Sequence, residues 1–327
     1  MTPIGLMNLQ RYPPSSRPIG AVEALGNAGG FSGARLWRFL APRGVLVLRC
    51  WPLQGPDRAH LEQVHAWLVE SADLGFLAVP IATVDGATLV DDHGRLWELA
   101  DWLPGSADRD RPPAREHLRA MFAGLALVHR RLAAHQSFGP SPGLTSRAEE
   151  LELLTRHEFA RLNAAIERKP TDPAAPLART WLVRAVGLAP RIADATRRAA
   201  LRPLPLQPCL RDARPDHFLL EGARLTGLVD FGAMGLDSVA GDLARLLAES
   251  VGADRLARSE ALRAYESIRS LSVSEARSIE DFERANAVLG PARWVRWQFI
   301  EGREFDEPDA VIRGLRRGLE RLDEAGL

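Results

Sequence analysis

The sequence is poor in cysteine and almost devoid of lysine. Its 327 residues include two cysteines, Cys50 and Cys209, and Lys169 is the only lysine, so nearly every basic side chain is arginine. Two cysteines in apolar surroundings cannot build a disulfide framework or a zinc site, and we expect buried thiols in a reducing compartment. Chemistry that needs a lysine must therefore use Lys169 or be carried out by arginine.

Long apolar runs and a charge bias are also absent. No run approaches the length of a membrane span, and residues 1–18 do not show the pattern of a signal peptide. The formal net charge is +0, which gives no indication of nucleic acid or an acidic membrane as a partner. With 46% hydrophobic and 26% charged residues, the composition is that of a soluble globular chain, and the length favours two lobes. We expect a cytoplasmic protein.

The first third of the chain has the pattern of a sheet. Residues 1–18 are rich in Pro, Ser and Arg and predict a loosely held lead-in. Strands are expected at residues 22–25, 34–39, 44–51, 79–84, 88–90 and 95–100. Residues 57–71 predict one helix with Asp57 as its N-cap. Pro104-Gly105 then breaks the chain, so we place an N-lobe at residues 19–104 and a C-lobe at 105–327.

A glycine-dense turn at residues 26–33 joins the first two expected strands. Backbone amides near Gly29, Gly30 and Ser32 could approach a phosphate closely, because glycine has no Cβ. Most glycine-rich hairpins are only hairpins, so both interpretations stay open. The chain has no GxxxxGK[ST] stretch, which excludes a P-loop, and no GxGxxG that opens a helix after a strand.

The rest of the chain is largely helical. Helices are expected at residues 115–132, 146–167, 177–200, 239–251, 254–268, 274–289, 291–301 and 309–323. His129 lies on an apolar stripe and is expected to be a hydrogen-bonded core histidine. Trp294 and Trp297 are at helical spacing, and core packing is favoured over a pocket wall. Acidic residues that could attract an amine-bearing acceptor, but are more typical of a solvated loop, are Glu304, Asp306, Glu307 and Asp309.

Within this helical part, residues 208–243 hold two carboxylates on either side of a predicted hairpin. Asp212 precedes the apolar runs at 218–220 and 225–229, and Asp230 follows them. A hairpin of this length can bring both carboxylates to one cleft. One could orient or deprotonate a hydroxyl while the other holds a divalent cation, which is the minimum equipment for phosphoryl transfer.

Three motifs in and after this stretch resemble those of the aminoglycoside phosphotransferase family, which has the protein-kinase fold and includes choline and homoserine kinases. The motifs are Leu210–His217 for H-G-D-x-H-x-x-N, Leu228–Gly232 for I-D-F/W and Asp237–Ala244 for D-P-x-x-D-L-A. The resemblance implies an α+β, two-lobed fold with an antiparallel-sheet N-lobe and a mostly helical C-lobe. It also implies ATP-dependent transfer to a hydroxyl of a small-molecule acceptor, with Mg²⁺ as cofactor.

The resemblance assigns roles to individual residues. Asp212 would be the catalytic aspartate, Asp230 the magnesium ligand, and Asp242 a buried brace of the catalytic loop. Arg49 takes the strand position where kinases place a phosphate-binding lysine, and Glu62 would be its partner. Arginine suits that position because it binds phosphate through two hydrogen bonds and stays charged.

The resemblance also places a hinge that recognises adenine, together with the residues that depart from the family pattern. Backbone groups of Ala100 and Trp102 would bind the base. Leu210 replaces a histidine that braces the catalytic loop, and His217 replaces the asparagine that is the second metal ligand. Imidazole suits Mg²⁺ poorly, so Asp216 could supply the oxygen, or Mn²⁺ could accept the nitrogen. A degenerate kinase that only binds a nucleotide or a partner is the alternative. A protein kinase is disfavoured because H-R-D-x-x-x-x-N and A-P-E are missing.

Overall fold

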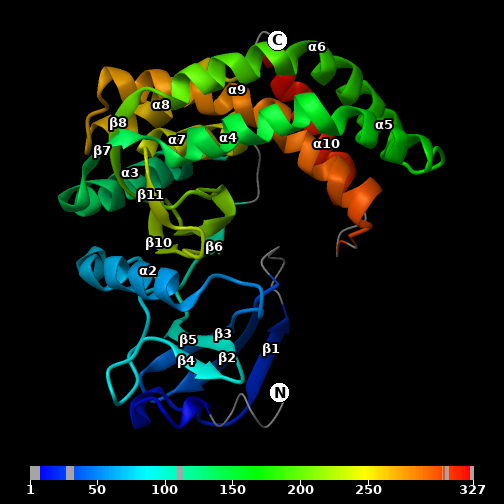
Figure 1. Cartoon of the computed structure of the whole chain (residues 1–327). Helices are drawn as coiled ribbons and strands as arrows, with labels where there is room; N and C mark the ends of the chain where they lie inside the picture. Colours follow the sequence, from blue (N-terminus) through cyan, green and yellow to red (C-terminus); the bar gives the residue numbers. More distant parts are fainter. Residues whose placement is uncertain (1–7, 27–32, 109–112, 304, 306–308, 325–327) are drawn as a thin grey trace. The chain divides into compact units, whose positions relative to one another are not determined.

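The structure is a computed structural model that describes residues 8–26, 33–108, 113–303, 305 and 309–324 (Figure 1). The chain divides into two compact units. One joins Met1–Arg109 to Asp216–Met234, and we call it the sheet unit. The other, the helical unit, joins Asp110–Pro215 to Gly235–Leu327. Among the described residues, no helix is long and apolar enough to cross a membrane.

A five-stranded antiparallel sheet forms the main part of the sheet unit (Figure 1). Its strands, in spatial order, are β1 (Val22–Gly26), β2 (Arg35–Ala41), β3 (Gly44–Cys50), β5 (Arg95–Asp101) and β4 (Val90–Asp92). The core side chains alternate along the strands, as the pleat requires, and Leu46, Leu48 and Leu99 are fully buried. The strand expected at residues 79–84 is wrong: only an isolated bridge joins Pro80 to Ala100. Proline has no N–H to donate to a ladder.

The segment before the sheet is not a loose lead-in over its described part, residues 8–18. Leu9 and Tyr12 are fully buried and belong to the core cluster of the sheet, so that expectation is wrong. Helix α2 (Arg58–Glu70) begins as predicted, because the Asp57 carboxylate accepts a hydrogen bond from the backbone N–H of His60 at 2.8 Å. Its Leu61 packs in a second apolar cluster of this unit.

The predicted hairpin forms and belongs to the sheet unit rather than to the helical part. Strands β9 (Phe218–Glu221) and β10 (Arg224–Leu228) pair antiparallel, and β6 (Ser106–Ala107) completes a three-stranded sheet. In Figure 1 these strands have colours far apart on the bar, since β6 comes more than 100 residues earlier. Gly105 has φ +94, and the Thr226 hydroxyl donates to the carbonyl of Pro104 at 2.8 Å beside it.

The helical unit contains α3 (Arg115–Arg131), α4 (Pro142–Leu153), α5 (Phe159–Glu167), α6 (Ala175–Ala200), α7 (Val239–Ser250), α8 (Arg255–Glu266), α9 (Val273–Val295) and α10 (Ala310–Glu324). Helices α4, α6, α9 and α10 lie side by side (Figure 1). A small antiparallel sheet has the order β11 (Gly235–Asp237), β8 (Pro203–Cys209) and β7 (Ser137–Pro140).

Two helix boundaries differ from the sequence prediction. The helix expected at 146–167 is divided by a π-helical segment at Leu154–Glu158. The two helices expected at 274–289 and 291–301 form one, because α9 continues through Pro291 before a π-helical segment at Arg296–Glu301. The ring of Pro291 fills the space beside Gly318 of α10, where a Cβ would overlap it. Packing between the helices therefore outweighs the helix-breaking tendency of the proline.

Candidate active site

Arg49 of β3 forms an ion pair, but not with the expected glutamate. Its Nη1 lies 3.5 Å from Oε1 of Glu98 and 3.6 Å from Oδ1 of Asp230. Glu62 instead pairs with Arg58, one turn earlier on α2, at 3.2 Å. The predicted Arg49–Glu62 pair is therefore wrong, whereas Arg49 and Asp230, predicted to contact the same nucleotide, do lie together in the sheet unit.

Glu98 is the residue of this cluster that sequence reasoning missed. It stands directly opposite Arg49 in the β3–β5 pairing, so only the register of these two strands could have identified it as the partner of Arg49. Its Oε2 accepts hydrogen bonds from Nε1 of Trp51 and from Nε2 of His65, both at 3.0 Å. Burial raises the pKa of Glu98, but the hydrogen bond from His65 and the charge of Arg49 outweigh it and hold the pKa below its usual value. Glu98 is thus a fixed anion that orients the guanidinium.

Asp230 and His217, the two predicted metal ligands, are also close together. Nε2 of His217 lies 3.6 Å from Oδ2 of Asp230, whose side chain is 40% exposed. Asp230 has φ +67, a left-handed conformation that costs a non-glycine residue on the order of 1 kcal/mol. Strain of this kind persists where the surrounding structure holds a side chain in place, commonly at functional sites.

These donors fit a divalent cation that is held mainly by phosphate oxygens. Mg²⁺ in nucleotide sites is bound by one or two carboxylates together with phosphates and water, and Asp230 offers one such carboxylate. The His217 imidazole is a nitrogen donor, which Mn²⁺ tolerates better than Mg²⁺. The residues present therefore suit a nucleotide-borne metal and do not form an all-protein metal cage.

The predicted adenine hinge is the end of β5. Ala100 lies in the strand, and the backbone N–H of Trp102 donates to the carbonyl of Val45 at 2.9 Å. The Trp102 indole is 40% exposed and lies under the guanidinium of Arg38, 5.0 Å from the ring centre. Trp102 can thus offer a nucleotide its ring, while its N–H already has a partner in the sheet.

Several predicted site residues lie outside the described residues. They are Gly29, Gly30, Ser32, Glu304, Asp306 and Glu307. The strands β1 and β2 that flank the first three pair antiparallel, as expected for a hairpin. The phosphate-binding role of the turn stays a prediction.

In the helical unit, Asp242 fixes the loop that carries Asp212. The backbone N–H groups of Leu210 and Arg211 donate to the two carboxylate oxygens of Asp242, each at 2.7 Å. Asp242 is 1% exposed and lies in the first turn of α7. Charge-assisted hydrogen bonds in a buried site are strong, so the residues just before Asp212 are held in one conformation.

An imidazole also reaches this brace, from a part of the chain where it was not expected. Nε2 of His129, on α3, donates to Asp242 at 3.0 Å. Position 210, where the family has its histidine, holds a buried Leu210. His129 is thus the hydrogen-bonded core histidine that its spacing predicted, and it gives the brace an imidazole that Leu210 cannot.

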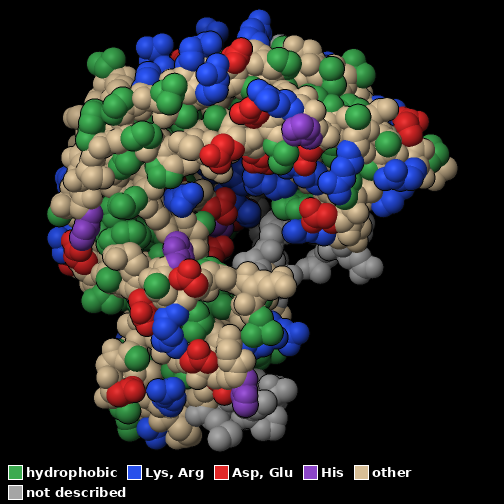
Figure 2. Space-filling view, viewed as in Figure 1, with side chains coloured by type: hydrophobic (Ala, Val, Ile, Leu, Met, Phe, Trp, Pro, Cys, Tyr) green, Lys and Arg blue, Asp and Glu red, His purple; other side chains and the backbone are tan. Residues whose placement is uncertain are grey.

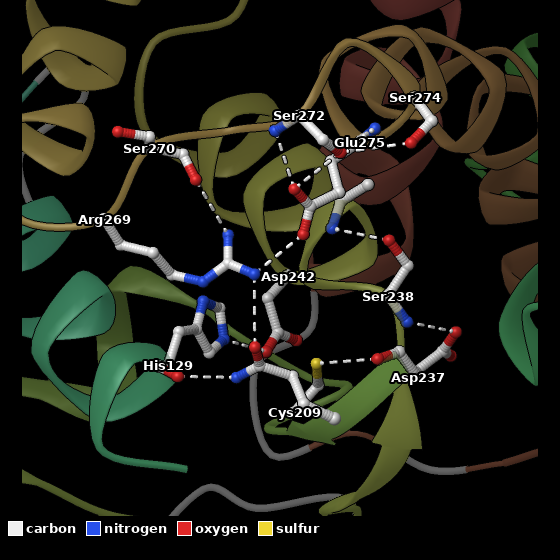
Figure 3. Close-up of polar contacts among 12 residues, drawn as sticks. His129, Cys209, Asp237, Ser238, Asp242, Arg269, Ser270, Ser272, Ser274 and Glu275 are labelled. Atoms are coloured by element: carbon white, nitrogen blue, oxygen red, sulfur yellow. Dashed lines mark hydrogen bonds and ion pairs between the residues drawn. The ribbon is translucent and has the colours of Figure 1, made fainter. Parts of the chain in front are cut away.

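His129, Cys209 and Asp242 are buried and bring their ligand atoms within 4.8 Å of one another, which by composition could be a metal site. Each group already has a hydrogen-bond partner, and Sγ of Cys209 donates to the carbonyl of Asp237 at 3.3 Å (Figure 3). Burial raises the pKa of Cys209 well above its usual value, which favours the protonated thiol that donates this hydrogen bond. The cluster is a structural brace.

Asp212 itself is 38% exposed, and Nε of Arg245 on α7 lies 3.5 Å from its Oδ1. Arg211, the preceding residue, has φ +61, where the family motif has glycine. Three described non-glycine residues have a positive φ, and two of them, Arg211 and Asp230, lie at or next to a predicted site aspartate.

Of the remaining predicted acceptor-side residues, Trp294 and Trp297 are partly buried, whereas Asp309 is exposed. Trp294 and Trp297 contact each other edge to face, with ring centres 5.1 Å apart, and Trp294 packs against the core of the helical unit. This agrees with core packing rather than a pocket wall. Lys169 donates to the carbonyl of Gln298 at 2.9 Å.

A family model described as the phosphotransferase enzyme family matches residues 23–282. No curated protein gives a significant match.

Solved structures resemble the chain over almost its whole length. An aminoglycoside phosphotransferase from Alicyclobacillus acidocaldarius shares 16% identity, with 97% of this chain and 92% of that chain covered and a TM-score of 0.65. A choline/ethanolamine kinase family protein from Mesorhizobium loti shares 19% identity, with 99% of this chain and 94% of that chain covered and a TM-score of 0.59. A spectinomycin phosphotransferase in complex with ADP and spectinomycin shares 11% identity, with 94% of this chain and 93% of that chain covered and a TM-score of 0.59. These likenesses confirm the predicted α+β, protein-kinase-like fold.

Proposed function

Because the chain belongs to the phosphotransferase enzyme family, we propose that it transfers the γ-phosphoryl group of ATP to a hydroxyl of a small molecule. The family match also confirms that the predicted class of enzyme is a phosphotransferase. That its acceptor is an alcohol group is part of the proposal. The ADP in the spectinomycin phosphotransferase supports an adenine nucleotide as the donor.

Asp212 accepts or orients the proton of the acceptor hydroxyl in this proposal. The observation that carries this proposal is that the Asp242 carboxylate accepts hydrogen bonds from the backbone N–H groups of Leu210 and Arg211. A catalytic base must be within hydrogen-bond reach of the proton it takes, so its backbone has to be fixed before the substrate arrives. A half-exposed carboxylate on a clamped loop meets that requirement.

Arg49 and Asp230 serve the phosphate side. The guanidinium, oriented by Glu98, binds phosphate oxygens, and Asp230 with His217 holds a nucleotide-borne Mg²⁺ or Mn²⁺. The cation, when bound, neutralises the charge that gathers on the transferring oxygens. The family resemblance supports further nucleotide contacts, which we propose for Gly29, Gly30, Ser32, Ala100 and Trp102. No such contact is proposed for Glu62, because it pairs with Arg58.

Two variants test the proposal. We expect Asp212→Asn to abolish metal-dependent ATP turnover, measured as ADP release with water as the acceptor, and to leave ATP affinity nearly unchanged. Asp230→Asn should lose the stabilisation that ATP and metal give in a thermal-shift titration. Asp194→Asn, in an exposed pair with Arg197, is the matched control. If the wild-type protein bound no ATP in the presence of Mg²⁺ or of Mn²⁺, the proposal would be contradicted.

A catalytically degenerate, nucleotide-binding module is the second candidate. His217 near Asp230 favours it, because imidazole is a weak ligand for Mg²⁺. ATP turnover that disappears in Asp212→Asn would exclude this candidate, whereas tight ATP binding with no turnover in the wild type would support it.

A further inference from the structure

Helix α2 contacts the ion pair of Arg49 through an imidazole. His65 lies on the buried face of α2 and is 4% exposed. Its Nε2 lies 3.0 Å from Oε2 of Glu98, and its Nδ1 lies 2.8 Å from the hydroxyl oxygen of Thr88. The glutamate that was predicted to reach Arg49 from this helix, Glu62, is occupied elsewhere. The helix thus contacts Glu98 through His65.

The two contacts of His65 define where its ring carries a proton. Glu98 is ionised at neutral pH, since its pKa lies below the usual value. An ionised carboxylate only accepts hydrogen bonds, so Nε2 of His65 carries a proton and donates it to Glu98. In the neutral ring Nδ1 is then an acceptor, and the Thr88 hydroxyl donates to it. Thr88 therefore orients His65, and His65 orients Glu98.

The two oxygens of Glu98 have different partners. Oε2 accepts from His65 and from Nε1 of Trp51, both at 3.0 Å, whereas Oε1 lies 3.5 Å from Nη1 of Arg49. The last torsion of a glutamate side chain is soft, so the carboxylate of a glutamate without such donors rotates easily. Two donors on Oε2 fix the plane of the Glu98 carboxylate, and Oε1 then attracts the guanidinium from one direction.

Trp51 holds the same guanidinium from a second direction. The central carbon of the Arg49 guanidinium lies 5.0 Å from the centre of the indole ring, which is a cation–π contact. Trp51 is 3% exposed and packs with Leu61 of α2 in one apolar cluster. A Cβ on Gly232 would overlap the indole, so the ring also contacts the chain two residues after Asp230.

A second histidine of α2 reaches the chain after Asp230. Nε2 of His60 lies 3.0 Å from the carbonyl oxygen of Gly232, to which it can only donate. The helix therefore makes two hydrogen bonds through imidazoles, one to the glutamate that pairs with Arg49 and one to the segment that carries Asp230. Both groups that we assign to the phosphate side are thus supported by α2.

The aim of the Arg49 guanidinium matters because the surface supplies little general attraction for a nucleotide. On the face that Figure 2 shows, basic and acidic side chains are interspersed over the sheet unit. Such a surface has no broad positive field that would gather phosphates. The Arg49 side chain is 20% exposed, and a guanidinium binds phosphate through two hydrogen bonds of fixed direction. Its contribution therefore depends on its orientation.

We propose that His65 is a positioning residue of the nucleotide site, which orients the Arg49 guanidinium toward the phosphates of ATP by holding Glu98. Trp51 acts beside it through the second hydrogen bond to Glu98. The inference rests on the proposed function and adds a residue of α2 to it. The acid that pairs with Arg49 comes from β5, and α2 supplies the donor that fixes this acid.

Calorimetric titrations of the full chain with ATP and with adenosine test the proposal, in Mg²⁺ or Mn²⁺, whichever supports binding to the wild type. His65→Phe keeps a ring but removes both nitrogens, and we expect it to bind ATP about five- to ten-fold more weakly. Adenosine has no phosphate, so its affinity should not change. His65→Gln keeps an N–H that can donate to Glu98 and should recover most of the ATP affinity.

A double-mutant cycle shows whether His65 acts through Arg49. Arg49→Gln alone should weaken ATP binding about ten-fold or more. Adding His65→Phe to Arg49→Gln should weaken it by no more than about two-fold further, because the group that His65 orients is already lost. His157→Phe, at an exposed position of the helical unit, controls for loss of one imidazole. If His65→Phe does not fold by circular dichroism, Trp51→Phe replaces it in the cycle, since phenylalanine keeps a ring under the guanidinium and removes the N–H.

The outcomes separate the positioning role from the proposed function. Additive losses in the cycle, or wild-type ATP affinity in His65→Phe, would overturn the positioning role even if the wild type turned ATP over. An equal loss of adenosine affinity would also overturn it, because His65 would then only support the fold. ATP binding with the expected coupling but without turnover would leave the positioning role standing while the proposed transfer failed.

Discussion

Nε2 of His129 lies 3.0 Å from Oδ2 of Asp242, although 113 positions separate the two residues in the chain. Nδ1 of the same ring accepts a hydrogen bond from the Tyr265 hydroxyl at 2.8 Å, and burial raises the pKa of Tyr265, so this hydroxyl keeps its proton. The tautomer of His129 is thereby fixed, and its N–H points at Asp242. Asp242 thus ties α3 to the loop that carries Asp212.

Replacement of Asp242 by asparagine should destabilise the protein by about 2–4 kcal/mol. Three N–H groups donate hydrogen bonds to Asp242. An amide has only one acceptor oxygen, so at least one of these N–H groups would face an NH₂ group in the asparagine variant. Urea denaturation measures the loss. The exposed Asp194→Asn should change the free energy of unfolding by no more than about 0.5 kcal/mol. Equal effects of the two substitutions would contradict the brace.

The positive φ of Arg211 predicts a difference between two substitutions at one position. Arg211→Gly and Arg211→Ala both remove the side chain, but only glycine adopts φ +61 without steric cost. We expect the glycine variant to be more stable than the alanine variant by about 1 kcal/mol. The order would reverse if the loop had an ordinary backbone conformation, because glycine has the greater entropy to lose.

Glu249 predicts an acid-sensitive contribution to stability. Burial raises its pKa, but Arg245, Arg321 and Arg317 outweigh that effect and lower it to about 2, from 4.5 in an exposed glutamate. A depressed pKa in the folded state stabilises the protein above pH 4.5, and this stabilisation is lost as the pH falls from 4.5 toward 2.

The contribution is on the order of 3 kcal/mol at neutral pH. Urea denaturation should therefore show wild type well above Glu249→Gln at pH 7, with the gap closing toward pH 3. A gap that stayed constant between these pH values would show that the glutamine variant fails for a reason other than charge.

The contact between His217 and Asp230 predicts an unusual metal preference. With an imidazole beside the carboxylate, Mn²⁺ should support ATP binding better than Mg²⁺, and His217→Asn should shift the preference toward Mg²⁺ by supplying an oxygen. Thermal-shift titrations with ATP and each metal measure this. His93→Asn, at an exposed turn, is the matched control, and identical metal preferences in wild type and His217→Asn would remove His217 from the metal site.

Local patterns in the sequence carried the prediction of single elements. Asp57 before an apolar stripe predicted the start of α2, and a separate apolar stripe, that of α3, identified His129 as a core residue. Relations between distant elements could not be obtained in that way. Glu98 faces Arg49 only because β3 and β5 pair in one register, and a helical glutamate, Glu62, was the nearer guess along the chain.

The same limit explains the brace and the acceptor side. Nothing near Leu210 indicates that an imidazole arrives from α3, since the helix stripe fixes the face of His129 but not its neighbour. On the acceptor side, the sequence directed attention to the acidic residues near 304–309, of which the structure describes Asp309 alone, as an exposed residue.

The membership of Asp216–Met234 in the sheet unit has a consequence for biosynthesis. A ribosome that has released residues 1–109 has not yet made β9 and β10, and at bacterial or eukaryotic rates the wait is on the order of ten seconds. During that interval β6 lacks its partner strand, and Arg49 lacks Asp230. A truncated product that ends before residue 216 would therefore be an incomplete unit with an unpaired edge, and a natural client for chaperones.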